Sequence, residues 1–228
     1  MKKLLPILFV LIITSCSNEV PSDQLVVRDG VSYRVNQENP FTGLTLSYHP
    51  NSQLKSRVKY KNGELNGLSE VYFENGQLKQ KVTHKNGKLD GVIETYYENG
   101  ILKQTGEFNK GIGYIETYYQ NGDLKSKEHL KDRIRDGLYE EFYQKGTTPD
   151  YFNHGELKLK SHYKDGLLNG PYEEYEPEGS LRKVYKNGEL DGYLEILYPN
   201  GSVRFREIYK EGKLHGTFES FDEDGQLV

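Results

Sequence analysis

Six histidines and a few adjacent glutamates are the residues of this chain whose types suit metal or acid–base chemistry. The histidines are His49, His84, His129, His154, His162 and His215. No two of them have the spacing of metal ligands. Adjacent carboxylates such as Glu140 and Glu141, or Glu173 and Glu174, suggest hydrolase acids, but neighbours along a strand point to opposite faces. We therefore expect no catalytic residue, no metal site and no cofactor, and the sequence indicates that the protein is not an enzyme.

Cys16 is the single cysteine, so its thiol cannot form an intramolecular disulfide. Before it stand two lysines, an apolar run over residues 4–13 and small residues, the pattern of a secretory signal that is too short to span a bilayer. Residues 13–16 (Ile-Thr-Ser-Cys) resemble the lipobox of bacterial lipoproteins, which implies cleavage before Cys16 and attachment of lipid to its sulfur. Ser17, where an inner-membrane signal would have aspartate, implies the outer membrane. The alternative is an ordinary signal peptide that leaves a free thiol.

The rest of the chain repeats a unit of about 24 residues. A glycine opens each unit, at Gly43, Gly67, Gly91, Gly113, Gly137, Gly170, Gly192 and Gly216. So short a unit buries its apolar side only by stacking on its neighbours. The long step after Gly137 predicts an insertion around residues 144–150.

Each unit has the pattern of a β-hairpin. Asn-Gly dipeptides recur between runs rich in Tyr, Val, Ile and Thr, which is the composition of strands joined by tight turns. A two-residue turn at Asn75–Gly76 would place Tyr72 opposite Lys79 and Glu70 opposite Lys81. The sequence predicts an all-β fold, an elongated, single-layer antiparallel sheet of tandem hairpins.

Three columns of side chains recur on one face of this predicted sheet. The glutamate column is Glu70, Glu94, Glu116, Glu140, Glu173, Glu195 and Glu219. The basic column is Lys55, Lys79, Lys103, Lys125, Lys158, Arg182 and Arg204. The aromatic column, which we take as the candidate binding face, is Tyr48, Tyr72, Tyr96, Tyr118, Phe142 and Tyr175. Aromatic residues flanked by charges suit binding, although the same pattern also describes a merely well-hydrated sheet.

Residues 60–67 (Tyr-Lys-Asn-Gly-Glu-Leu-Asn-Gly) and 185–192 (Tyr-Lys-Asn-Gly-Glu-Leu-Asp-Gly) carry a family resemblance. Followed by Tyr-x-x-Asn-Gly-x-Leu-Lys, this pattern resembles the MORN repeat in the variant form of bacterial exported proteins. The resemblance spans roughly residues 41–228 and implies an elongated, twisted antiparallel sheet. Related sequences are often labelled antitoxins of the YwqK type.

Four segments follow from these patterns: a lipoprotein signal peptide (1–15), a tether from the lipidated cysteine (16–23), an N-terminal capping hairpin (24–42) and about eight repeats (43–228). Removing residues 1–15 takes away two lysines and moves the formal charge from −4 to −6. That mild acidity argues against a nucleic-acid partner, which would require a basic surface.

Three functions fit a repeat array with no catalytic motif. The first is a protein-interaction scaffold with an unknown protein partner, held on the membrane of the bacterial envelope by its lipid anchor. The second is an antitoxin or immunity-like protein that neutralises an effector. The third is binding of carbohydrate or peptidoglycan through the aromatic column.

Overall fold

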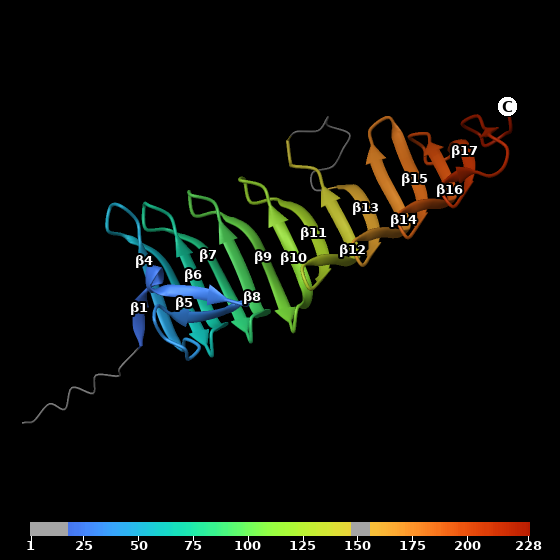
Figure 1. The fold of residues 1–228 in the computed structure, drawn as a ribbon. Coiled ribbons are helices and arrows are strands. Elements are labelled where there is room, and N and C mark those ends of the chain that lie inside the picture. The colour runs from blue at the N-terminus through green and yellow to red at the C-terminus, as the bar shows by residue number, and fades with distance from the viewer. Residues whose placement is uncertain (1–17, 147–155) are drawn as a thin grey trace, which may run out of the picture.

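The computed structural model describes residues 18–146 and 156–228. Seventeen strands in these residues form one open sheet, and β2 and β3 pair separately as a hairpin. Figure 1 shows an elongated ribbon that twists from its blue N-terminal end to its red C-terminal end. The predicted all-β class and the array of antiparallel hairpins are confirmed.

The strands pair in the order in which they occur in the chain. From β4 to β17 each strand is antiparallel to the next, and β17 also pairs with β18 and β19. The elements are β1 (Glu19–Pro21), the short 3-10 helix η1 (Ser22–Gln24), β2 (Leu25–Arg28), β3 (Val31–Arg34), β4 (Gly43–Tyr48), β5 (Leu54–Lys61), β6 (Glu64–Tyr72), β7 (Leu78–Lys85), β8 (Lys88–Tyr96), β9 (Leu102–Asn109), β10 (Ile112–Tyr118), β11 (Leu124–Lys131), β12 (Ile134–Phe142), β13 (Leu157–Lys164), β14 (Leu167–Glu176), β15 (Gly179–Lys186), β16 (Glu189–Leu197), β17 (Val203–Lys210), β18 (Lys213–Leu214) and β19 (Glu219–Ser220).

The Asn-Gly dipeptides form two different turns. At Asn62–Gly63 both residues have positive φ (51° and 75°), as a two-residue type I′ hairpin turn requires. At Asn75–Gly76 only the glycine does (83°), and its N–H donates to the Phe73 carbonyl at 3.0 Å. This is a three-residue loop with a bulge at the glycine, so the predicted two-residue turn at Asn75–Gly76 is wrong.

A second bulge lies beside that loop, at the start of β7. Tyr72 pairs with Leu78 and Val71 with Gln80, so Lys79 is the extra residue of this second bulge. Beyond the bulge the register returns to the predicted one, because Glu70 pairs with Lys81. Extra residues recur at the equivalent positions of most other repeats.

The apolar core is thin because the sheet is a single layer. Its centre is Phe108, Ile115 and Leu130, which are at most 9 % exposed, and Leu89 and Ile93 pack against them. These residues come from strands β8 to β11 and lie on one face of the sheet. Each repeat therefore buries its apolar side chains against those of its neighbours, as expected for a solenoid.

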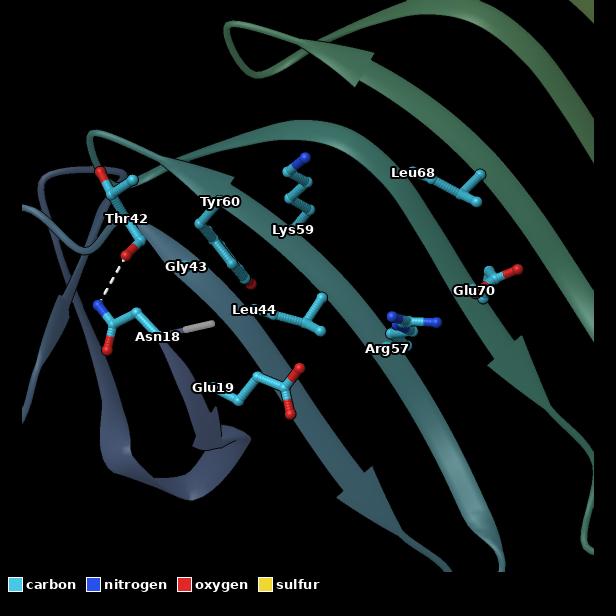
Figure 2. Close-up of a pocket in the computed structure, with 10 residues that line it drawn as sticks. All are labelled: Asn18, Glu19, Thr42, Gly43, Leu44, Arg57, Lys59, Tyr60, Leu68 and Glu70. Atoms are coloured by element: carbon cyan, nitrogen blue, oxygen red, sulfur yellow. Dashed lines mark hydrogen bonds between the residues drawn. The ribbon is translucent and has the colours of Figure 1, made fainter. Parts of the chain in front are cut away.

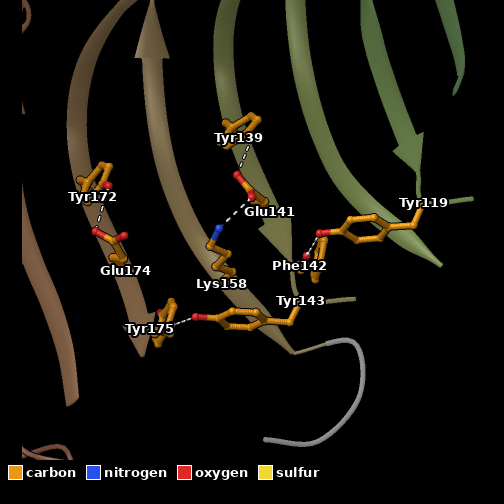
Figure 3. Close-up of polar contacts among 9 residues, drawn as sticks. All are labelled: Tyr119, Tyr139, Glu141, Phe142, Tyr143, Lys158, Tyr172, Glu174 and Tyr175. Atoms are coloured by element: carbon orange, nitrogen blue, oxygen red, sulfur yellow. Dashed lines mark hydrogen bonds and ion pairs between the residues drawn. The ribbon is translucent and has the colours of Figure 1, made fainter. Parts of the chain in front are cut away.

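Tyrosine hydroxyls form hydrogen bonds between consecutive repeats, at one end of the strands. Tyr119 donates to the Phe142 carbonyl at 3.0 Å, and Tyr143 donates to the Tyr175 carbonyl at 2.9 Å (Figure 3). Tyr97 and Tyr198 make the same contact with the next repeat. These tyrosines directly follow the aromatic column in the sequence. Aromatic doublets such as Tyr118–Tyr119 are the sequence signal for this contact.

Tyr119→Phe is expected to lower the free energy of unfolding by about 1 kcal/mol, because one hydrogen bond is lost without a change of shape. Phe73 occupies the position equivalent to Tyr119 in its own repeat and lacks the hydroxyl, so the reverse substitution can be made there. Phe73→Tyr is expected to stabilise the array by a similar amount. Thermal unfolding of both variants measures this, and equal midpoints for both would contradict the assigned contact.

The N-terminal residues of the described chain are attached to the first repeat. Glu19–Pro21 forms β1, which pairs in parallel with β4, and Val20 is 3 % exposed. Residues 19–21 of the predicted tether therefore lie in the sheet. The predicted capping hairpin contains β2 and β3, and its Ser32 N–H donates to the Gly63 carbonyl at 2.9 Å.

Several predicted features lie outside the described residues. They are the signal peptide, Cys16 and most of the insertion around residues 144–150. Within the described chain, no helix has the length and apolar character needed to cross a membrane.

Candidate interaction surface

A row of charged side chains crosses one face of the sheet from β5 to β19. Each member pairs directly with the member on the next strand, so all of them point to the same side. In order, the row is Arg57, Glu70, Lys81, Glu94, Thr105, Glu116, Lys127, Glu140, Lys160, Glu173, Arg182, Glu195, Arg206 and Glu219. We call this row the charge ladder and the side that carries it the ladder face.

Ion pairs form between neighbouring members of the charge ladder. Lys127 lies 3.0 Å from Glu116, and Arg206 lies 2.7 Å from Glu195. Lys127 is more than a third exposed, so its pair with Glu116 adds only a few tenths of a kcal/mol. Glu195 is buried, and Arg206 supplies the opposite charge there. The ladder therefore sets register and keeps the face charged.

The predicted glutamate column is part of the charge ladder. The predicted basic column is not: of its residues, only Arg182 belongs to the ladder. The lysines of the basic column sit at the bulges instead, and four of them, Lys79, Lys103, Lys125 and Lys158, lie over aromatic rings. Lys79, Lys103 and Lys125 place their ammonium groups 5.4 to 5.7 Å from the ring centroids of Phe73, Tyr97 and Tyr119. The one-residue bulge explains the difference, because an extra residue moves the side chain away from the row that simple alternation assigns to it.

The predicted binding-face tyrosines lie beside the ladder on the same face. Tyr96 and Tyr118 each donate their hydroxyl at 2.9 Å to Glu94 and Glu116 of the same strand. Tyr175 makes the equivalent bond to Glu173 at 2.6 Å. Burial, and then the hydrogen bond to the carboxylate, raise the pKa of Tyr118 and of Tyr175 to about 12. These rings are therefore held neutral and fixed in place.

The other members of the aromatic column differ in exposure. Tyr48, in the first repeat, is 59 % exposed, whereas Tyr72 and Phe142 are half-buried. Burial and the Glu70 carboxylate raise the pKa of Tyr72. The structure thus brings all six predicted residues to one side of the sheet, with four hydroxyls turned toward the glutamates of the ladder.

A pocket of about 490 Å³ lies at the N-terminal end of the ladder face (Figure 2). Leu44 and Leu68 supply its apolar contacts, and Arg57 and Lys59 project from the strand between them. Among the described residues, neither cation has a carboxylate within ion-pair distance. Glycine is required at Gly43, since a Cβ there would overlap with the Asn18 carbonyl oxygen.

The opposite face has an open groove of about 660 Å³ over β5 to β11. Its lining is mainly Val58, Val71, Val82, Ile93, Phe108, Ile115 and Leu130. Farther along, the same face becomes polar: Tyr139 and Tyr172 donate to Glu141 and Glu174, and Lys158 pairs with Glu141 at 3.2 Å (Figure 3). One face of one sheet thus changes from apolar to tyrosine-rich along its length.

His84 lies in the wall of the groove and is 8 % exposed, with no hydrogen-bond partner for Nδ1. Burial, helped by the charge of Arg133, lowers the pKa of His84. Because the folded pKa is below the unfolded one, the protein binds more protons when it unfolds and loses stability as the pH falls below about 6.5. The equivalent residues opposite the repeat glycine are apolar or aromatic, such as Tyr60 and Phe108.

His84→Phe is expected to stabilise the protein by about 1 kcal/mol at neutral pH, since it removes an unsatisfied buried nitrogen. The stabilisation relative to the wild type should be larger at pH 5, because the variant lacks the histidine whose protonation favours unfolding. Denaturant unfolding at the two pH values measures both effects. An unchanged pH dependence would show that His84 is not the group that titrates, and His215→Phe, at an exposed position, is the matched control.

The described residues contain no group of three or more histidine, cysteine, aspartate or glutamate side chains arranged to hold a metal. His49 and His129 instead contact backbone carbonyls, at 3.0 and 3.2 Å. Glu140 lies in the charge ladder and Glu141 on the opposite face, and Glu173 and Glu174 divide in the same way. The described residues therefore offer two long surfaces for contact: the charged ladder face, and an opposite face that is apolar over β5 to β11 and rich in tyrosine and charge farther along.

The family model of the MORN repeat variant matches residues 41–62, 65–86, 89–110, 113–132 and 214–228. These five segments are MORN repeats of the variant kind. The hairpins from β12 to β17 lie outside these matches but continue the same antiparallel pairing, so the structure extends the array through them. The β16–β17 hairpin repeats the bulge of the matched repeats, whereas β14–β15 has a two-residue loop and no bulge. A search of curated proteins finds no match to this MORN-repeat chain.

Proposed function

We propose that this MORN-repeat protein is a protein-interaction scaffold of the bacterial envelope, anchored by lipid on Cys16. The observation that supports it best is the charge ladder with its fixed tyrosines, which strand after strand presents on the same face of the sheet. A face built from half-buried aromatic rings and ordered charges is suited to binding another protein. Its rows are repeated, so several segments of a long partner can dock along it.

A photo-crosslinking residue at Val92 tests this proposal. Val92 lies on the ladder face of β8, two residues from Glu94, and is 38 % exposed. The matched control is Gln104 on β9, which pairs with Thr95 and points to the opposite face. After irradiation, cells that carry the Val92 variant should yield one defined cross-linked partner. Cells that carry the Gln104 variant should not.

Two outcomes would count against the ladder face as the binding surface. Cross-links from Gln104 alone would place the partner in the apolar groove. No cross-link from either position, with unchanged envelope behaviour when the gene is deleted, would argue against a binding role for the sheet. Cross-linking to a toxic effector would make the protein an immunity factor, which uses the same surface.

A further inference from the structure

The charge ladder is broken at one strand. Elsewhere, each glutamate inside the row has a lysine or arginine on both neighbouring strands. Glu94 and Glu116 have a cation on one side only, Lys81 and Lys127, because β9 places Thr105 between them. One long cationic side chain is therefore replaced by a short uncharged one.

No neighbouring residue of β9 supplies the lost charge. Glu107 lies two residues beyond Thr105 on the same face and is exposed, so it adds a negative charge. The nearest lysine along the strand is Lys103, and its ammonium lies 5.6 Å from the Tyr97 ring centroid. Three carboxylates thus surround a position that elsewhere in the ladder holds a cation.

Another part of the charge ladder shows which chemical group fits between two glutamates on neighbouring strands. The guanidinium of Arg206 lies between two glutamates of the neighbouring strands, 2.7 Å from Glu195 and 3.6 Å from Glu219. Glu94 and Glu116 stand in the same relation to Thr105. Charged hydrogen bonds of this kind are stronger than neutral ones, and arginine can contact two carboxylates at once.

Both glutamates are already oriented for such a contact. Tyr96 and Tyr118 hold one oxygen of Glu94 and of Glu116 at 2.9 Å. The two carboxylate side chains are 26 % and 24 % exposed, so a group arriving from solution can reach them. Val92, 38 % exposed on the same face, adds apolar area beside them.

We propose that the β8–β10 part of the ladder face docks a basic, extended segment of a protein partner, whose arginine enters the ladder at Thr105 between Glu94 and Glu116. This rests on the proposed interaction function and names the chemistry of the partner. The arginine completes the row in the way that Arg206 does, and further basic residues face Glu107. The carboxylates would repel an acidic segment, and a neutral segment would leave them without an opposite charge.

The test is binding of a fluorescent peptide of alternating Arg and Ser residues to the purified full-length protein, followed by anisotropy. The comparison peptide has citrulline, which is neutral and of similar shape, in place of arginine. Wild-type protein should bind the arginine peptide at least about tenfold more tightly than the citrulline one. Raising the salt concentration should weaken that binding, because the pairs are partly exposed.

Thr105→Lys decides whether the site is the one proposed. The added lysine fills the gap from within the chain, so affinity for the arginine peptide should fall about tenfold. Thr105→Val, which keeps the shape and adds no charge, should retain the wild-type affinity. Equal binding by the lysine and valine variants would overturn the proposal. Thermal unfolding shows whether both are folded, and Glu94→Gln with Glu116→Gln gives a second test that should weaken binding similarly.

These results are separable from those of the cross-linking experiment. A partner cross-linked at Val92 without a basic segment would overturn the inference and leave the scaffold standing. Peptide binding that depends on Thr105 would support the inference even where the cross-linked partner engages other strands as well.

Discussion

Gly106→Ala is expected to destabilise the protein by about 3 kcal/mol, because the added methyl group has no space. Gly106 lies in β9 and pairs with Ile93 on one side and Ile115 on the other. A Cβ would overlap with the carbonyl oxygen of Tyr114 and lie 3.1 Å from Ile93 Cγ2. Since the obstacle includes backbone, β9 and β10 would have to move apart, beside the Phe108 and Leu130 core.

Thermal unfolding measures this effect, and a loss of that size lowers the melting temperature by about 6–12 °C for a domain of this length. Gln104→Ala is the matched control, since it introduces alanine on the same face of β9, two residues away, without adding volume. A Gly106→Ala protein that melted with the control would contradict the close approach of β9 and β10.

Cys16→Ser is expected to abolish lipid attachment completely, because serine lacks the thiol to which diacylglycerol is transferred. The wild-type protein should incorporate radiolabelled palmitate and sediment with membranes, and the variant should do neither. Under the proposed lipidation, several acyl chains hold the wild-type protein on the membrane. Without them the variant should lose this membrane association, and less of it than of the wild type should be recovered in the membrane fraction.

Ser17→Ala is the control for this experiment, because it changes the neighbouring residue and keeps the thiol. Its labelling should equal that of the wild type. Palmitate incorporation in the serine variant would contradict lipidation at Cys16. An unlabelled wild-type protein of reduced length would favour the ordinary cleaved signal peptide.

Much of the fold was predictable because the repeat is short and regular. Recurrent glycines and Asn-Gly dipeptides indicate hairpins, and strand-like runs between them indicate one antiparallel sheet. The pairing of Glu70 with Lys81 was also predictable, since strict alternation holds in the middle of each strand. The candidate face was predicted as well, because the aromatic residue and the glutamate two positions before it must share a side.

The register near the loops could not be predicted in this way. Asn-Gly occurs both at Asn62, whose φ is positive, and at Asn75, whose φ is not, so the same dipeptide makes turns of different length. The second kind adds one residue to a strand and moves Lys79 out of the row opposite Tyr72. A one-residue slip moves every side chain that it reaches to the other face of the sheet.

The sequence by itself determined that this chain is a tandem array of antiparallel hairpins with a glutamate and an aromatic residue repeated on one side. Only the tertiary structure decided which cations meet those glutamates, that Thr105 interrupts them, and that Tyr119 bonds to the next repeat. Local pattern sets strand, turn and alternation, because these depend on neighbours along the chain. Pairing between repeats depends on bulges and on contacts between residues more than twenty positions apart, such as the hydrogen bond from the Tyr119 hydroxyl to the Phe142 carbonyl.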